Sequence, residues 1–480
     1  MKRSRSLAAA VSAVALLIGG CSATVTSGQA VSPVYDAFRA GGLPVQEGPS
    51  GVRDDAPAPE GDVKGTDGGP IDKLALLAVN DISDYWQKNF SESLDGKFTP
   101  ITRFVSYDSD DPSSPPVCGS KTYRNPNASY CPSKKLMSWD RGVLVPTGKK
   151  YFGETSVAAL IAHEYGHAVQ TMANLVEEDT PGIVWEQQAD CFAGTYIRWV
   201  AEGQSPRFQL STGDGLNHVL AAITTIRDSV YGPNDAELIQ QGHGTALDRI
   251  SAFQIGFTSG ASECAKIDYD EIKQRRGDLP LVLNDPSGEG GNVTIDEDNL
   301  QQLMEVLGAV FKLANPPTLS FDQPTCSDAK PTPPAFYCPS SNTIFADLDA
   351  LKVLGAPADL EDDMLVKGDN TAFAAVTSRY ALAVQHQKNL PLDNAAAALR
   401  TACLTGFAQA AMIEPVQLPS GEQGLTLTAG DFDEAVASLL TSGFVASNVN
   451  AETVPSGFTR IIAFRSGLAG DEDLCFKRFK

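Results

Sequence analysis

The stretch His163-Glu164-Tyr165-Gly166-His167 places two histidines four residues apart, with a glutamate directly after the first. On a helix, residues four apart share a face, so both imidazoles can bind one metal ion while the glutamate reaches a water molecule beside it. The chain has only 5 histidines among 480 residues, so a chance occurrence of this spacing is improbable. The stretch predicts a helix with His163 and His167 as zinc ligands and Glu164 as the general base.

A catalytic zinc ion usually takes a third protein ligand and leaves one position for water. Glu186 is the best candidate, because two imidazoles and a carboxylate suit zinc and because it lies in a second predicted helix over 181–200. Asp190 follows four residues later, so it can accept a hydrogen bond from a ligand histidine and orient the ring. The acidic run at 177–179 lies closer in sequence and competes for the role of third ligand, although a turn between the helices suits it better.

Eight cysteines form two sets with nearly the same spacing. They are Cys118, Cys131, Cys191 and Cys264, then Cys326, Cys338, Cys403 and Cys475. The chain has 9 cysteines, and with Cys21, near the N-terminus, set aside their number is even. An even number of cysteines in an exported protein, which the N-terminus described below predicts, is typical of a disulfide framework in an oxidising compartment. Each set allows three pairings. We expect the pairs Cys118–Cys131, Cys191–Cys264, Cys326–Cys338 and Cys403–Cys475.

Other residues recur together with the cysteines. Tyr130-Cys131-Pro132-Ser133 recurs as Tyr337-Cys338-Pro339-Ser340, and Arg249-Ile250 recurs as Arg460-Ile461. We therefore predict a tandem duplication, with one copy over 70–276, a Gly-rich linker over 277–292 and a second copy over 293–480. In the first copy we expect helices over 72–90, around the histidines from Thr155 or Ser156, and over 181–200, with strands over 102–107 and 135–145. The predicted class is α+β with helices dominating.

The second copy lacks the metal-binding residues. When the recurring residues are aligned, the positions of His163, Glu164, His167, Glu186 and Asp190 are occupied by Ser378, Arg379, Leu382, Ala398 and Ala402. None of these side chains is a zinc ligand, and an arginine would repel a cation. We expect a metal-free copy that packs against the first, as a structural partner, a substrate-recognition module or a lid.

The N-terminus predicts export and a lipid anchor. Residues 1–21 combine a basic start, a short apolar stretch and Gly19-Gly20-Cys21, which describes a secretory signal and resembles the bacterial lipobox, in which the cysteine is lipidated. Residues 22–69 are rich in Ser, Gly, Pro and Asp, so we expect a flexible tether. These features predict a protein anchored by lipid to the cell membrane, on its extracytoplasmic side. The net charge of -22 argues against nucleic acid as a partner.

Several spaced motifs in the first copy resemble one family. The two histidines, the run from Glu186 to Gly194, Tyr130-Cys131-Pro132 and His243-Gly244-Thr245 are similar to those of the bacterial putative neutral zinc metallopeptidase family. The resemblance implies a zincin-type fold, with His163, His167 and Glu186 as ligands of Zn2+ and Glu164 as the catalytic carboxylate. It also favours His243 as a donor that stabilises the oxyanion. The family commonly has a second histidine after the motif, where this chain has Ala168, and we expect metal binding to survive that difference.

Three functions fit these features. The first is an exported zinc metallopeptidase that hydrolyses peptide bonds in envelope or extracellular proteins. The alternative is a non-enzymatic envelope lipoprotein whose paired domains bind a partner, and a third is a metal-dependent amidase acting on cell-wall peptide. The presence of Glu164 favours an enzyme, because a purely structural zinc site has little need for that carboxylate.

Overall fold

The structure is a computed structural model that describes residues 32–283, 291–322, 325–358 and 365–480. Helices dominate the described residues, in agreement with the expected α+β class. In the first half the helices are α1 (Pro70–Ser93), α2 (Leu144–Phe152), α3 (Glu154–Ala173), α4 (Gly182–Ala201), α5 (Asp214–Thr225), α6 (Ala246–Ser259), α7 (Ala261–Cys264) and α8 (Tyr269–Arg276). In the second half they are α9 (Glu297–Phe311), α10 (Leu348–Leu354), α11 (Asp369–Gln387), α12 (Ala395–Ala411), α13 (Asp431–Leu440), α14 (Gly457–Leu468) and α15 (Glu472–Arg478).

Each half contains one small mixed sheet. The first half has the short strands β1 (Arg39–Ala40), β2 (Leu43–Pro44), β3 (Gly51–Val52), β4 (Val63–Lys64) and β8 (Phe208–Gln209), and the longer strands β5 (Phe104–Tyr107), β6 (Ala128–Cys131) and β7 (Leu136–Asp140). The order β4-β5-β7-β6 leaves β6 at an edge, antiparallel to β7, while β5 runs parallel to β7. The second half has β9 (Thr318–Ser320), β10 (Ala335–Cys338) and β11 (Thr343–Ala346), with β10 antiparallel and β9 parallel to β11.

Two expected boundaries in the first half are wrong. The strand expected over 135–145 ends at Asp140, because the carboxylate of Asp140 accepts the backbone N–H groups of Gly142, Val143 and Leu144 and turns the chain into α2. Helix α3 begins at Glu154, one residue before the expected cap at Thr155 or Ser156. The hydroxyl of Ser156 bonds the Phe152 carbonyl instead of capping the helix.

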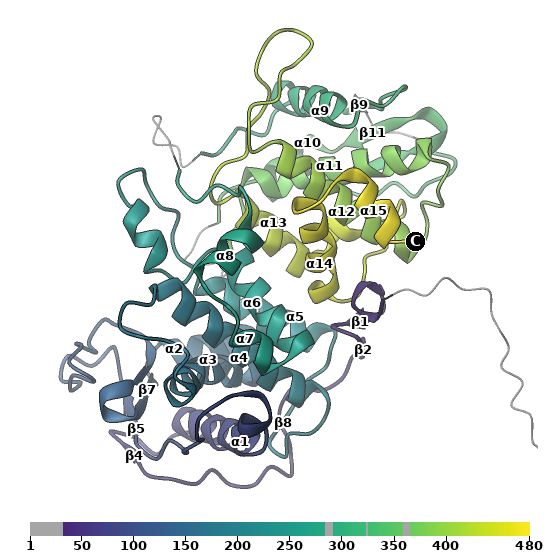
Figure 1. The fold of residues 1–480 in the computed structure, drawn as a ribbon. Coiled ribbons are helices and arrows are strands. Elements are labelled where there is room, and N and C mark those ends of the chain that lie inside the picture. The colour runs from purple at the N-terminus through teal and green to yellow at the C-terminus, as the bar shows by residue number, and fades with distance from the viewer. Residues whose placement is uncertain (1–31, 284–290, 323–324, 359–364) are drawn as a thin grey trace, which may run out of the picture. The chain divides into compact units, whose positions relative to one another are not determined.

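Helices α3 and α4 cross closely, and this crossing positions the predicted ligands (Figure 1). A Cβ atom at Gly166 would lie 2.9 Å from the Cα atom of Ala189, so only glycine fits at this point of α3. Helix α3 ends at Ala173, and the next residue, Asn174, has a left-handed backbone (φ 53°) and serves as the C-terminal cap. The close approach brings the histidine face of α3 against the Glu186 face of α4.

The flexible tether expected over 22–69 is wrong for its described part, 32–69. Strand β3 pairs with β8, and β4 joins the main sheet beside β5. Backbone groups of this segment also bond to the rest of the first half, since Val52 N–H donates to Glu154 and Gln46 N–H donates to Thr212. These hydrogen bonds order a segment whose composition offers little apolar surface to bury. Residues 1–31, with the signal segment and Cys21, and residues 284–290 of the linker lie outside the described residues.

The four disulfides join the expected cysteines, which confirms the predicted pairing. Cys118–Cys131 and Cys326–Cys338 each attach a loop to a strand, β6 and β10. Cys191–Cys264 ties α4 to α7, and Cys403–Cys475 ties α12 to α15. The same pair of links therefore stabilises the small sheet and the helices in each half.

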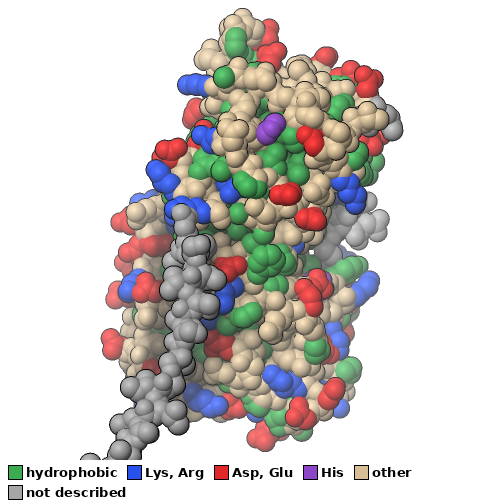
Figure 2. Space-filling model, turned by 90° about the vertical axis from the view of Figure 1, so that its right-hand side faces the viewer, with side chains coloured by type: hydrophobic (Ala, Val, Ile, Leu, Met, Phe, Trp, Pro, Cys, Tyr) green, Lys and Arg blue, Asp and Glu red, His purple; other side chains and the backbone are tan. Residues whose placement is uncertain are grey.

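Residues 32–480 form one compact unit. Helix α13 of the second half contacts α5 and α6 of the first, near the middle of Figure 1. On the face drawn in Figure 2, acidic and basic side chains are interspersed over both halves. Within the described ranges, no helix combines the length and apolarity that crossing a membrane requires.

Candidate metal centre

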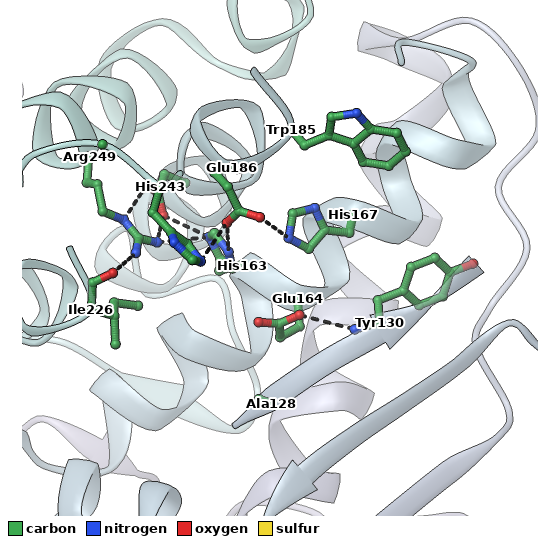
Figure 3. A network of polar contacts seen from close by, with 12 residues as sticks. Ala128, Tyr130, His163, Glu164, His167, Trp185, Glu186, Ile226, His243 and Arg249 are labelled. Atoms are coloured by element: carbon green, nitrogen blue, oxygen red, sulfur yellow. Dashed lines mark hydrogen bonds and ion pairs between the residues drawn. The ribbon is translucent and has the colours of Figure 1, made fainter. Parts of the chain in front are cut away.

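The predicted ligands come together between α3 and α4 (Figure 3). The Nε2 atom of His163 lies 3.1 Å from Oε2 of Glu186, and Nε2 of His167 lies 3.6 Å from Oε1 of the same carboxylate. One nitrogen or oxygen atom from each of the three residues lies within 4.8 Å of the others. Two imidazole nitrogens and a carboxylate oxygen at such separations are a donor set that fits zinc.

The second nitrogen of each imidazole is held by a neighbour, which leaves both Nε2 atoms for a metal. His163 Nδ1 lies 2.7 Å from Oδ1 of Asp190. His167 Nδ1 lies 3.0 Å from Oε1 of Gln170. The amide nitrogen of Gln170 donates to the carbonyl of Trp185, so its oxygen faces the imidazole and accepts the Nδ1 proton. Fixing the tautomer in this way is a regular feature of metal-binding histidines.

Asp190 links the centre to a buried arginine. The Nε and Nη2 atoms of Arg249 donate to the two carboxylate oxygens of Asp190 at 2.8 and 2.7 Å. Burial alone would raise the pKa of Asp190, but Arg249 and His163 outweigh it and hold that pKa below its ordinary value. The arginine is fully buried, and its Nη1 donates to the carbonyl of Ile226 at 2.5 Å. Asp190 is therefore ionised and fixed, as a partner that orients His163 must be.

Glu164 faces the centre without occupying a ligand position in the cluster. Its Oε2 accepts the backbone N–H of Tyr130, on strand β6, at 3.1 Å (Figure 3). Burial raises the pKa of Glu164 above its ordinary value, against the opposing charges of His163 and His167. A buried carboxylate with a raised pKa, held beside a metal site, has the character of a general base.

His243 approaches the same carboxylate from the loop before α6. Its Nε2 lies 3.5 Å from Oε2 of Glu186, and its side chain is 50% exposed, so it can reach a bound substrate. Asp228 fixes this loop, because its carboxylate accepts the backbone N–H of His243 at 3.0 Å and that of Gly244 at 2.7 Å, and lies 3.2 Å from His243 Nδ1. Despite burial, these bonds lower the pKa of Asp228 to about 2.

The imidazoles and the carboxylates of the centre stabilise each other's charged forms. Burial lowers the pKa of His163, but Asp190 and Glu186 outweigh that effect and raise it to about 10. Burial raises the pKa of Glu186, but His163, His167 and His243 hold it well below its usual range. A proton and a zinc ion therefore compete for Nε2 of His163, and acid weakens metal binding.

An apolar cavity of about 230 Å³ opens beside His163 and Asp190. Its other walls come from α2, α3, α4, α5 and the residue after α5, with the apolar side chains Leu144, Phe152, Leu160, Ala222, Ile223 and Ile226 among them. An apolar hollow next to a few fixed polar groups is the usual form of a site for a small molecule or a side chain.

Most residues of this centre were predicted from the sequence, but two residues that hold its histidines in place were not. The competing acids at 177–179 are exposed in the loop between α3 and α4, away from the cluster. Asp228 and Gln170 had no assigned role, although both fix a histidine. Ala168-Val169-Gln170 recurs in the second half as Ala383-Val384-Gln385, which was a signal for Gln170, whereas no pattern in the sequence marked Asp228.

No curated protein and no solved structure matches the chain. Residues 64–267 match the family model described as putative neutral zinc metallopeptidase, and every residue of the centre falls within that segment.

Proposed function

We propose that this chain is an exported, lipid-anchored zinc metallopeptidase that hydrolyses peptide bonds in envelope or extracellular proteins. The observation that carries the proposal is the position of Glu164, buried beside His163, His167 and Glu186 and oriented by a backbone N–H group. A site built only to bind zinc has no need of this fourth group. Labelling with a fatty acid that disappears in Cys21→Ser tests the anchor.

The residues of the centre divide the chemistry among them. His163, His167 and Glu186 would hold zinc, which supplies Lewis-acid chemistry to water and to the scissile carbonyl. Glu164 accepts the proton of the attacking water and passes it to the leaving amine. His243 donates a hydrogen bond to the oxygen of the tetrahedral intermediate, from a loop that Asp228 holds in place.

The edge strand β6 offers a place for an extended peptide. Tyr130 N–H donates to Glu164 and so points away from β7 toward the centre. In an antiparallel pair, the N–H and C=O groups of one residue point the same way, so the Tyr130 carbonyl also faces outward. An extended peptide can add along such an edge by backbone hydrogen bonds. The cavity beside His163 would then take an apolar side chain of that peptide.

We infer that the second half is a duplicated copy that lost its metal site and packs against the first. The recurring order of strands, helices and disulfides supports the duplication. Ser378 and Arg379 lie on α11, as His163 and Glu164 lie on α3, while Ala398 and Ala402 lie on α12. This loss is the observation that favours the second candidate function, a non-enzymatic lipoprotein that binds an envelope partner.

Glu164→Gln separates the two functions. Glutamine keeps the size and the hydrogen-bond acceptor, so zinc should stay bound while casein hydrolysis falls by roughly 10²- to 10⁴-fold, the usual contribution of a general base. The matched control is Glu177→Gln, an exposed glutamate in the loop after α3, which should leave both unchanged. Elemental analysis gives the metal content, and release of labelled peptides gives the rate. Hydrolysis that survives in Glu164→Gln, or is absent in the zinc-loaded wild type, contradicts the peptidase.

A further inference from the structure

Helix α13 of the metal-free half directs one buried carboxylate into the first half. Asp433 lies in the first turn of α13 and is 5% exposed. Its Oδ2 accepts a hydrogen bond from Nε of Arg227 at 3.0 Å, and its Oδ1 accepts the backbone N–H of Ala246 at 2.9 Å. Both donors belong to the first half, so a single side chain binds two points there.

These two points bracket the loop that carries His243. Arg227 directly precedes Asp228, and Ala246 begins α6 three residues after His243. Between them, Asp228 binds the backbone N–H groups of His243 and Gly244. Asp433 therefore holds the ends of the loop, and Asp228 holds its middle.

The charges around Asp433 suit a fixed carboxylate. Burial, with repulsion from Asp248, raises its pKa to about 6, and Arg227 and the Ala246 N–H oppose that rise by stabilising the ionised form. Its contact with Ala246 falls at the N-terminus of α6, where the helix dipole favours a negative charge. Hydrogen bonds with a charged partner are among the stronger ones in proteins.

We propose that Asp433 is a positioning residue for catalysis, through which the metal-free half holds the His243 loop beside the metal centre. His243 Nε2 lies 3.5 Å from Glu186, and the position of its loop depends on contacts at both ends. The inference rests on the proposed peptidase function. It gives the second half a task that requires neither a metal nor a separate ligand.

Asp433→Asn in the full chain tests this inference. The amide nitrogen of asparagine cannot accept a hydrogen bond, so at least one of the bonds to Arg227 and Ala246 is lost. We expect kcat/KM for a labelled casein peptide to fall about 10-fold, mainly in kcat, with zinc content unchanged. Asp431→Asn is the matched control, because Asp431 lies on the same helix, is 6% exposed and binds Thr428 of its own half. Equal losses in the two variants overturn the inference.

A double-mutant cycle shows whether Asp433 acts through His243. His243→Ala alone removes the proposed donor, and Asp433→Asn should then change kcat/KM by less than about twofold. A loss of the same factor in both backgrounds would mean that Asp433 only stabilises the fold, and overturns the inference. If Asp433→Asn does not fold, Arg227→Gln breaks the same contact from the first half and should give the same pattern.

Hydrogen exchange separates this inference from the peptidase proposal. The amides of His243 and Gly244 bond to Asp228, so faster exchange there reports a loosened loop and not the direct loss of a bond to Asp433. We expect at least about 10-fold faster exchange of these amides in Asp433→Asn and no change in Asp431→Asn. Unchanged exchange overturns the inference whatever the activity. Faster exchange in Asp433→Asn, together with a wild type that hydrolyses nothing, would leave Asp433 as the residue that holds the loop and would reject the peptidase.

Discussion

The two halves share a close helix crossing. Where α4 crosses α6 in the first half, a Cβ atom at Gly256 would overlap the carbonyl oxygen of Cys191. Where α12 crosses α14 in the second half, a Cβ atom at Gly467 would overlap the carbonyl oxygen of Cys403 in the same way. A glutamine that bonds α3 to the next helix also has a counterpart in the second half. Gln170 donates to the Trp185 carbonyl, and Gln385 donates to the carbonyl at the matching place of α12. The close helix contacts are thus alike in the two halves.

The buried charges differ. Arg249 in the first half binds the carboxylate of Asp190, whereas Arg460, its counterpart, donates only to backbone carbonyls in the hydrogen bonds of the second half. Arg379, in place of Glu164, likewise bonds to carbonyls and serine hydroxyls and stacks on Phe444. Packing and disulfides therefore hold this fold, and the charges of the centre are an addition that the scaffold does not need.

The largest expected difference between the halves is in metal binding. His163→Ala removes a ligand, so zinc affinity should fall by more than the roughly 10- to 100-fold that the loss of a ligand's hydrogen-bond partner costs. Ser378→Ala at the matching place of α11 should leave a single zinc ion per chain. Elemental analysis after dialysis against a weak chelator measures both. Zinc that persists in His163→Ala, or is lost in Ser378→Ala, would place the metal elsewhere.

Patterns with a fixed spacing could be predicted from the sequence. The histidine helix, Glu186, Asp190 and the four disulfides follow from residue types at set intervals, and the structure brings each set together. Contacts between distant segments could not be predicted. Asp228 fixes His243 across a loop, and the backbone of 32–69 pairs with strands far along the chain, because backbone hydrogen bonds leave little signature in residue type.

The buried arginines should differ in what their removal costs. Arg249→Met removes the larger of the two cationic partners of the buried Asp190 carboxylate and leaves only His163, which costs about 3–5 kcal/mol. Arg460→Met leaves neutral carbonyls without donors, which costs about 1–3 kcal/mol. Urea denaturation of the full chain measures both free energies of unfolding. Equal costs would mean that His163 alone compensates the charge of Asp190, and would remove the charge distinction between the halves.

The smallest expected difference is in how stability depends on pH. In the first half, Glu186 lies beside His163 and Asp190 lies beside Arg249, whereas Asp369, Asp431 and Glu434 of the second half lie beside one another. Burial, with repulsion from Asp431 and Asp369, raises the pKa of Glu434 to about 9.

A carboxyl whose pKa is higher in the folded chain contributes stability below its unfolded pKa of about 4.3, and this contribution is lost as the pH rises through the folded value. Glu434→Gln keeps an acceptor for the Asn370 N–H but cannot ionise, so it should match the wild type below about pH 4 and resist urea better at pH 9. A variant less stable than the wild type at pH 9 would mean that Glu434 is held as an anion by a cation, and that the second half also keeps a charged cluster.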